Sequence, residues 1–295
     1  MTSVAVIANQ NKSLGGGLPE LRRLLADRGV DNPLWYEVAK SRKAPRQALR
    51  AVEQGADLVL LWGGDGTVQR CLDALAGCDV AVAVIPAGTA NLLAGNLGIP
   101  TDLTRAVDIA LDGDRRPIDL GVINGERFAV MAGAGFDAIM MKEADRGLKD
   151  RLGQMAYVWT GTKAVRARPV QMSIKVDGSQ WFKGRASCLL LGNMGMLTGG
   201  LEPFPDARPD DGLLEIGVVT ASNPVQWARV LGRLVTGKAE RSKNVRIGRG
   251  HRVSVNLATK VPYELDGGAR PSAKRLRVRI DPRAVRLCVP EKAGS

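Results

Sequence analysis

The sequence predicts an α/β plus all-β fold, with an N-terminal mostly parallel α/β domain at residues 1–124 and an antiparallel β-sandwich at residues 125–295. In the first half, buried-strand runs alternate with amphipathic helical patterns, an order typical of a parallel sheet covered by helices on both faces. In the second half, short apolar runs are separated by turn signals, as in antiparallel β-domains. Asn124-Gly125 lies where the pattern changes, so we place the domain boundary there.

The elements of the first half follow from their hydrophobic periodicity. In the first helix, Leu21, Leu24 and Leu25 share one face and Gly29 follows the end, which is the pattern of an amphipathic helix stopped by glycine. The expected strands are Val4–Asn9, Leu34–Val38, Asp57–Leu61 and Val80–Ile85, and the expected helices are Pro19–Arg28, Pro45–Gln54, Val68–Ala76, Leu92–Leu97 and Thr101–Leu111.

The second half is dominated by short β-rich runs. Asp177-Gly178 joins two of them at the spacing of a hairpin turn. The expected strands are Phe128–Met131, Val170–Val176, Ala186–Leu191, Leu214–Val219, Arg252–Leu257, Leu276–Ile280 and Val285–Val289, with helical patterns at Leu148–Arg166 and Pro224–Val235.

The composition excludes several classes of protein. No apolar run approaches the roughly 20 residues of a membrane-spanning helix, and the start of the chain lacks the basic segment of a signal peptide. The four cysteines are scattered without a Cys-x-x-Cys pair, which indicates reduced residues of a cytoplasmic protein, not a zinc site or disulfide framework. The one histidine, His251, lies in a basic run, so we reject a Ser-His-Asp mechanism or a His-rich metal site.

The two halves differ in charge. Residues 1–122 hold 13 Lys and Arg against 14 Asp and Glu, whereas residues 123–295 hold 29 against 16. A basic domain next to a neutral one predicts an extended anionic partner, and we favour an anionic membrane surface. Only 4% of the residues are aromatic, which argues against binding of single-stranded nucleic acid, and we expect no nucleic-acid partner. We therefore predict peripheral association with the inner face of the membrane; a merely solvated basic face is the alternative.

The stretch Trp62-Gly63-Gly64-Asp65-Gly66-Thr67-Val68 joins a predicted buried strand to a predicted helix. Glycines at such a turn can adopt φ > 0 and let a ligand approach the backbone, and the amides at a helix start favour phosphate. Asp65, expected to be an exposed loop carboxylate, would repel a bare phosphate, so it indicates a divalent cation or a hydroxyl donor beside the phosphate. A tight turn with an exposed Asp is the alternative.

A second loop of the same kind follows the next predicted strand. It reads Pro86-Ala87-Gly88-Thr89-Ala90-Asn91 and again leads into a predicted helix. Two strand–loop–helix units in tandem indicate two loops that line one nucleotide crevice at the carboxyl ends of parallel strands. Thr89 and Asn91 offer a hydroxyl and an amide to phosphate groups, or either residue caps the helix; the residues alone leave both interpretations open.

Together these motifs resemble the catalytic domain of the diacylglycerol kinase and sphingosine kinase family, in its bacterial soluble lipid kinase branch. The Gly-Gly-Asp-Gly stretch is also shared with NAD kinases and phosphofructokinases, so alone it identifies only the superfamily. The second loop narrows the resemblance to the lipid kinases. Three later stretches match as well, Ile118–Gly121, Ala132–Ala138 and Pro205–Leu214. The resemblance extends from Val4 to about Pro290 and implies the same two-domain fold.

The resemblance implies ATP-dependent phosphoryl transfer, which needs a phosphate cradle, a divalent cation and an oriented nucleophile. Asn9–Gly17 occupies the position of the family's amino-terminal nucleotide loop, with Gln10 where relatives usually have Pro. Lys12 is the expected counter-charge for phosphate, or else a flexible exposed lysine. The candidate ATP-binding residues are Asn9, Lys12, Ser13, Ser41, Gly63, Gly64, Asp65, Gly66, Thr67, Val68, Gln69, Thr89 and Asn91, with Ser41 the weakest match.

Asp210-Asp211-Gly212 resembles the structural magnesium loop of the family. The resemblance implies that Mg²⁺ is bound by the Asp211 side chain and by the main-chain carbonyls of Arg208 and Leu213. Oxygen-only ligation suits this hard cation. Asp119 resembles a residue that is tied to the ion through water, and a simple turn is the alternative for the Asp-Asp-Gly stretch.

Three departures from the family pattern concern catalysis. Where relatives read Asp-Gly-Glu, this chain reads Asp266-Gly267-Gly268, and the missing glutamate is the proton acceptor of the family. Asp266, or Glu264 on the same strand face by period two, must then serve. We take Asp266 as the catalytic base and Asp65 as the second catalytic residue. The other departures are Gln69-Arg70 in place of Asn-Glu and Leu92 in place of Asp.

The sequence therefore predicts an ATP-dependent, Mg²⁺-requiring lipid kinase that converts diacylglycerol to phosphatidic acid. Ceramide, a sphingoid base, monoacylglycerol or a prenol-linked acceptor would need the same residues, so the sequence does not name the lipid. Two alternatives stay open. One is an NAD kinase with a soluble substrate, and the other is a catalytically weak or silent nucleotide- and lipid-binding homologue, motivated by Gly268 and Gln69-Arg70. A homodimer is also left open.

Overall fold

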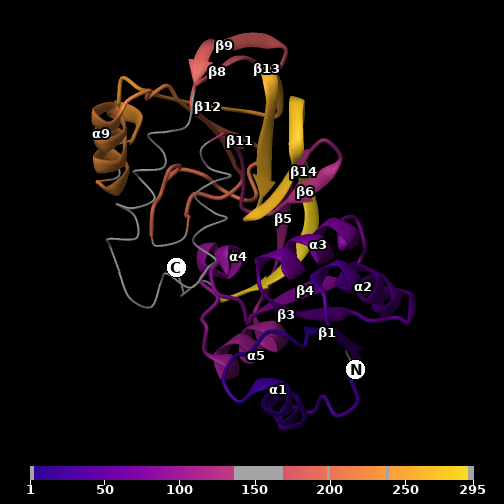
Figure 1. Ribbon diagram of the computed structural model, residues 1–295. Coiled ribbons are helices and arrows are strands. Elements are labelled where there is room, and N and C mark those ends of the chain that lie inside the picture. The colour runs from indigo at the N-terminus through magenta and orange to yellow at the C-terminus, as the bar shows by residue number, and fades with distance from the viewer. Residues whose placement is uncertain (1–2, 136–168, 198–199, 237–238, 292–295) are drawn as a thin grey trace. The chain divides into compact units, whose positions relative to one another are not determined.

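The computed structural model describes residues 3–135, 169–197, 200–236 and 239–291 (Figure 1). The chain divides into two compact units, residues 1–120 together with 282–295, and residues 121–281. These compact units differ from the predicted ranges 1–124 and 125–295, because residues 121–124 group with the second unit and residues 282–295 with the first. The predicted domain ranges stay a prediction. The predicted helix Leu148–Arg166 and the motif residues Phe136–Ala138 lie outside the described residues.

The first unit contains the predicted parallel sheet. Its strands pair in the order β4-β3-β1-β2, and each of these pairs is parallel. The end of β14 (Gly268–Val289) adds to β4, also in parallel. Buried residues fill β1, β3 and β4, which explains their near-continuous apolar sequences. The strand bounds are β1 (Val4–Asn9), β2 (Leu34–Val38), β3 (Leu58–Gly63) and β4 (Ala81–Pro86).

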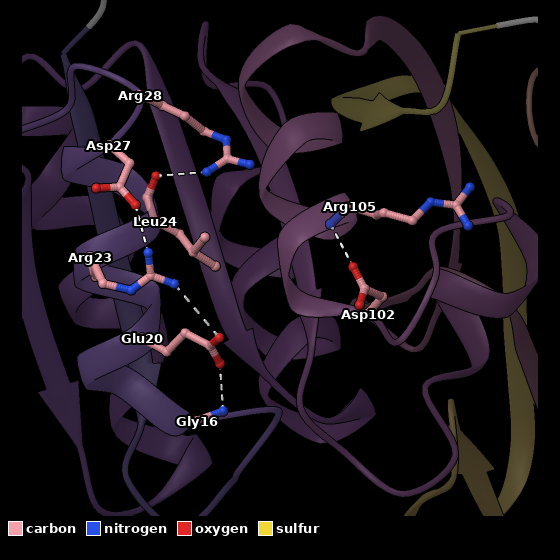
Figure 2. A network of polar contacts seen from close by, with 8 residues as sticks. All are labelled: Gly16, Glu20, Arg23, Leu24, Asp27, Arg28, Asp102 and Arg105. Atoms are coloured by element: carbon pink, nitrogen blue, oxygen red, sulfur yellow. Dashed lines mark hydrogen bonds and ion pairs between the residues drawn. The ribbon is translucent and has the colours of Figure 1, made fainter.

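Helices cover both faces of this sheet, with α2 and α3 on one face and α1 and α5 on the other (Figure 1). Figure 2 shows how two of them begin. Glu20 accepts a hydrogen bond from the Gly16 amide before α1, and Asp102 accepts one from the Arg105 amide at the start of α5. The bounds are α1 (Gly17–Ala26), η1 (Ser41–Lys43), α2 (Ala44–Glu53), α3 (Asp65–Leu75), α4 (Leu92–Asn96) and α5 (Leu103–Asp112).

The second unit is antiparallel and β-rich, as predicted. Its strands pair in the order β12-β11-β10-β7-β13-β14, and β8 and β9 extend from β13. No helix in the described part of the chain is long and apolar enough to cross a lipid bilayer. The bounds are β5 (Asp114–Ile123), β6 (Glu126–Phe128), β7 (Met131–Gly135), β8 (Val170–Val176), β9 (Ser179–Ala186), β10 (Cys188–Gly192), β11 (Leu214–Val219), α9 (Pro224–Val235), η2 (Ala239–Arg241), β12 (Val245–Gly250) and β13 (Arg252–Leu265).

Alternation along β13 and β14 separates the core of the second unit from solvent. Val253, Val255 and Leu257 are buried in one apolar cluster with Leu276 and Val278. The residues between them on both strands are exposed. This is the period-two pattern of a strand with one face packed and the other solvated.

Two-residue turns with left-handed backbone join three strand pairs. Asn124-Gly125, Asp177-Gly178 and Asp266-Gly267 each have φ > 0 at both residues, as type I′ hairpins require. Asp177-Gly178 joins β8 to β9, as predicted, and Asn124-Gly125 joins β5 to β6. The predicted strands Leu276–Ile280 and Val285–Val289 are parts of the single strand β14.

Candidate functional site

The first glycine motif ends β3 and begins α3. The helix starts at Asp65, so the loop is shorter than predicted and Thr67 and Val68 lie in the first helical turn. The amides of Thr67 and Val68 donate to the Gly64 carbonyl at 2.8 and 3.1 Å. The positive end of the helix dipole therefore lies at Gly64 and Asp65, where an anion such as phosphate is favoured.

Asp65 connects the first glycine loop to the second. It is partly buried, not exposed as predicted. Its carboxylate oxygens accept hydrogen bonds from the backbone amides of Asn91 (3.0 Å) and Leu92 (2.6 Å). Because these amides lie at the start of α4, the carboxylate caps that helix and balances its dipole. Leu92 takes part through its backbone, so its departure from the usual Asp leaves this contact in place.

Asn91 fixes the shape of the second loop. Its φ is 49°, a left-handed conformation that Asn tolerates better than most residues. The side-chain Oδ1 accepts a hydrogen bond from the Gly88 amide (2.9 Å), and Nδ2 donates to the carbonyls of Pro86 (3.0 Å) and Gly88 (2.9 Å). The Asn91 side chain is thus engaged within the loop, whereas Thr89 is exposed.

The two glycine loops touch at Gly64 and Gly88. A Cβ atom on Gly88 would lie 2.4 Å from Cα of Gly64, and one on Gly64 would lie 3.0 Å from Cα of Gly88. Neither position has room for a side chain. A Cβ atom on Gly64 would also lie 3.7 Å from Cε of Lys12. The predicted phosphate-binding lysine therefore extends to the point where the two glycine loops meet.

Three predicted polar residues from separate segments form one hydrogen-bonded cluster. Asn9 Nδ2 donates to Thr67 Oγ1 (3.1 Å) and to Ser41 Oγ (3.4 Å), and Thr67 Oγ1 donates to Ser41 Oγ (3.1 Å). Asn9 and Thr67 are buried and Ser41 is partly buried. The structure thus brings Ser41, the weakest match in the sequence, to the end of β1 and the start of α3.

The loop between β1 and α1 is fixed near both ends. Trp62 Nε1 donates to the Lys12 carbonyl (3.1 Å), and Glu20 accepts from the Gly16 amide at the other end (Figure 2). Ser13 lies between these anchors and is exposed. Trp62 was not among the predicted site residues, and no sequence signal could have found it, because its partner is 50 positions away.

Asp119 is buried in the first unit and holds the returning chain. Its Oδ1 accepts a hydrogen bond from the Arg283 amide (2.7 Å). Arg283 has a left-handed φ of 50°, so this bond fixes the backbone where β14 enters the first unit. The predicted link from Asp119 through water to a magnesium ion stays a prediction.

The predicted base Asp266 lies in the second unit and anchors its backbone. It is 5% exposed. Its Oδ1 accepts from the amides of Val130 and Met131 (both 2.9 Å), and its Oδ2 accepts from Ala129 (2.7 Å). These bonds fix the connection between β6 and β7. Asp266 lies in the turn beyond β13 with a φ of 43°, so it does not share a strand face with Glu264 as we expected.

Arg270 lies beside the position of the missing glutamate. A Cβ atom on Gly268 would lie 2.8 Å from Arg270 Nη1. The guanidinium donates from Nε (2.6 Å) and from Nη2 to the Glu126 carboxylate, and this hydrogen bonding raises the pKa of Arg270. The space next to Gly268 therefore holds a cation that is paired with a carboxylate. Glu264 is buried, at 1% exposed.

The predicted magnesium loop is an exposed turn before β11. Asp211 Oδ1 accepts a hydrogen bond from the Leu213 amide (3.0 Å), across Gly212 with a φ of 75°. Among the described residues, no three His, Cys, Asp or Glu side chains are grouped so that they could hold a metal. An ion here would therefore depend on Asp211 and on the carbonyls of Arg208 and Leu213.

The charge around this turn suits a cation. Burial raises the pKa of Glu215, and the neighbouring carboxylates of Asp211 and Asp206 raise it further, while Arg249 acts in the opposite direction. The raised pKa of Glu215 thus reflects mainly its burial, and Asp211 and Asp206 add negative charge beside the turn. A hard, oxygen-ligated ion such as Mg²⁺ fits these donors.

Comparisons with known proteins match both parts of the chain. Residues 3–123 match the family model of the diacylglycerol kinase catalytic domain, and residues 130–289 match that of the YegS C-terminal NAD kinase beta sandwich-like domain. The chain belongs to this lipid kinase family. A diacylglycerol kinase from Bacillus subtilis is 33% identical over 229 residues, which cover 76% of this chain and 75% of the relative. A protein named "Probable lipid kinase YegS-like" from Pseudomonas aeruginosa is 34% identical over 264 residues, covering 88% and 84%.

Solved structures share the fold of this lipid kinase family member. A diacylglycerol kinase from Bacillus anthracis has a TM-score of 0.77 at 20% identity and covers 97% of this chain and 96% of its own. An NAD kinase from Archaeoglobus fulgidus, solved in complex with ATP, has a TM-score of 0.51 at 12% identity and covers 97% and 93%. At these identities the likeness shows the fold alone. Membership of the kinase family implies ATP as the phosphate donor, for which a divalent metal ion is typical.

Proposed function

We propose that this kinase transfers the γ-phosphate of ATP to the hydroxyl of diacylglycerol and so produces phosphatidic acid. The observation that carries the proposal is the convergence of three loops in the first unit. Lys12 extends to Gly64, Gly64 touches Gly88, and Asp65 bonds the start of α4. Phosphoryl transfer depends mainly on positioning and on electrostatic stabilisation of phosphate charge, and this arrangement supplies both.

The first unit would hold the nucleotide. The start of α3 and Lys12 would face phosphate charge, and the Asn9–Ser41–Thr67 cluster would offer hydroxyl and amide groups. Asp65 would keep the second loop in place for the same ligand. Mg²⁺, when bound, would neutralise negative charge on the phosphates, and in the second unit Asp211 with the carbonyls of Arg208 and Leu213 would hold a structural ion.

The acceptor hydroxyl needs a proton acceptor within about 2.6–3.2 Å, directly or through one water. Asp266 stays our proposed base, and Glu264 is the alternative. Three backbone amides hold the Asp266 carboxylate in one orientation, so this carboxylate would take the proton at a fixed position. A base restrained in this way predicts slow but real turnover, because a loose transition state depends less on the base than on positioning.

The names of the relatives support a lipid as the acceptor. The similar proteins from Bacillus subtilis and Pseudomonas aeruginosa are named as a diacylglycerol kinase and a lipid kinase, while the likeness to NAD kinases is one of fold. Because a lipid acceptor lies in a bilayer, we also infer that the enzyme works at an anionic membrane surface.

The test is transfer of radiolabelled γ-phosphate from ATP, with diacylglycerol in vesicles, other lipid alcohols in vesicles, or NAD in solution as the acceptor. We expect label in phosphatidic acid and none in NADP. Label in another lipid would replace diacylglycerol as the substrate. Label in NADP would favour an NAD kinase, and nucleotide binding without transfer to any acceptor would favour a silent homologue.

A further inference from the structure

One face of the second unit carries a regular array of cations. On β14, Arg275, Arg277 and Arg279 are exposed, and they alternate with the buried residues Leu276 and Val278. The three arginines therefore point away from the core on the same side of the strand. This places a positive charge at every second residue along that part of the strand.

The register of the sheet extends this array across neighbouring strands. Arg277 lies opposite Ser254 on β13, which in turn lies opposite Lys175 on β8. Residues directly opposite in an antiparallel pair share a face. In a second row, Arg275 lies opposite Asn256 on β13, and Asn256 lies opposite Ser173 on β8. Ser173 in turn lies opposite Lys183 on β9. We call these outward residues the basic sheet face: Lys175, Lys183, Arg185, Arg252, Arg275, Arg277 and Arg279.

The basic sheet face is poorly neutralised within the protein. Arg252 lies directly opposite Arg279, and like charges at such positions destabilise a sheet. Arg279 pairs with Asp281 at 3.2 Å, and within the described part of the chain no other member of the face forms an ion pair with a carboxylate. Residues 121–281 as a whole hold 26 Lys and Arg against 15 Asp and Glu. The strands thus retain repulsive charge that the fold does not require.

We propose that the basic sheet face docks the kinase on an anionic lipid surface, an inference that rests on the proposed function because a lipid acceptor requires contact with a membrane. A sheet face presents its cations side by side, so several can contact lipid phosphates at once. Each basic residue close to an anionic leaflet strengthens binding. The outward positions of β13 and β14 in this face carry no aromatic residue on which a base could stack, which favours lipid over single-stranded nucleic acid.

The test is sedimentation of the full chain with vesicles, without ATP, so that the result does not depend on catalysis. One variant combines Arg252→Gln, Arg275→Gln and Arg277→Gln. The matched control combines Arg46→Gln, Arg50→Gln and Arg105→Gln, which removes the same charge from exposed positions of the first unit. Vesicles are phosphatidylcholine alone or an equal mixture with phosphatidylglycerol, each at low and high salt. Duplex and single-stranded DNA are titrated in parallel.

We expect the face variant to bind mixed vesicles about 100-fold more weakly than the wild type, from three basic residues that each contribute about fivefold. The control should bind nearly as the wild type does, and high salt should weaken both. With diacylglycerol dispersed in neutral detergent, the face variant should keep wild-type turnover, so a failure of docking is distinguished from a failure of the kinase. The proposal would be overturned if the face variant and the control lost vesicle binding equally, or if the face variant bound vesicles as the wild type does. A loss of binding to DNA alone would also overturn it.

Discussion

Asp65-Gly66 in the first unit and Asp266-Gly267 in the second are alike in sequence, and both aspartates bond backbone amides from a distant segment. Asp65 is partly buried and accepts two amides at the start of α4. Asp266 is 5% exposed and accepts three amides between β6 and β7. The hydrogen bonds of Asp65 join two glycine loops that touch each other. Those of Asp266 hold the turn between β13 and β14 against the connection between β6 and β7.

The two aspartates therefore differ in how their structural hydrogen bonds relate to their proposed functional roles. At Asp65 the structural bonds and the proposed ligand site coincide, because the bonded segments are the loops that would hold ATP. At Asp266 the structural bonds compete with the proposed role, since an oxygen that accepts amides is a weaker acceptor for a substrate proton. Substitution should therefore affect activity most strongly at Asp65, and should affect stability at both positions.

Asp65→Ala is expected to give the largest effect, with loss of detectable phosphoryl transfer. It should also lower the free energy of unfolding by about 1–3 kcal/mol, because two amides lose a charged acceptor. An exposed loop carboxylate, as expected from the sequence, would have changed stability by only about 0.5 kcal/mol or less. Chemical denaturation and a labelled-ATP assay measure both effects. Asp31→Asn, at an exposed position, is the control and should match the wild type; full activity in Asp65→Ala would remove Asp65 from the mechanism.

Asp266→Asn is expected to lower turnover by about 10²-fold, as for loss of a general base. It should also lower the free energy of unfolding by about 1–3 kcal/mol, because an Asn side chain brings an NH₂ group against backbone donors. Turnover measured far below the unfolding midpoint separates the two effects. Wild-type turnover there, together with the expected loss of stability, would leave Asp266 as an anchor and point to Glu264 as the base.

Gly88→Ala is expected to separate the two glycine loops, since the new Cβ would lie 2.4 Å from Cα of Gly64 and 2.6 Å from Asn91 Oδ1. We predict a lower unfolding midpoint and ATP affinity reduced about tenfold or more, corresponding to about 1.4 kcal/mol. The matched control is Gly232→Ala in α9, where a Cβ meets no atom within 4 Å. That change should raise stability slightly, by about 0.5–1 kcal/mol. Unchanged ATP affinity in Gly88→Ala would show that the loop contact does not shape the nucleotide site.

Asp211→Asn is expected to give the smallest effect without metal, within about 0.5 kcal/mol of the wild type, because the side chain is exposed. Mg²⁺ should raise the unfolding midpoint of the wild type and leave that of the variant unchanged, since an ion that binds the folded state stabilises it. Asp210→Asn, on the adjacent exposed residue, is the control. An equal response to Mg²⁺ in all three proteins would place the ion elsewhere.

The fold of the first unit could be predicted almost element by element, because buried parallel strands and amphipathic helices leave strong local patterns. The start of α3 was placed too late, since Gly64 and Gly66 weaken a helical pattern that the structure begins at Asp65. The return of β14 to the first unit could not be predicted, because the pairing of Arg286 and Leu287 with β4 joins segments about two hundred residues apart.

The candidate site was predictable to the level of its loops and not to the level of its contacts. The motifs identified Asn9, Thr67 and Ser41 separately, but their mutual hydrogen bonds arise from the way β1, α3 and η1 pack. The three amides on Asp266 and the guanidinium beside Gly268 were also not predictable. Such contacts depend on strand pairing, which period-two patterns do not specify.

We propose that this chain uses ATP, held by the loops around Asp65, to phosphorylate a membrane lipid. The most direct measurement is incubation of wild type and Asp65→Ala with radiolabelled ATP and a total lipid extract, followed by separation of the labelled lipids. We predict one major labelled lipid with the wild type, identified as phosphatidic acid, and none with Asp65→Ala. If the wild type labelled no lipid, the chain would not be a lipid kinase. If both proteins labelled the same lipid, Asp65 would not be needed for the transfer.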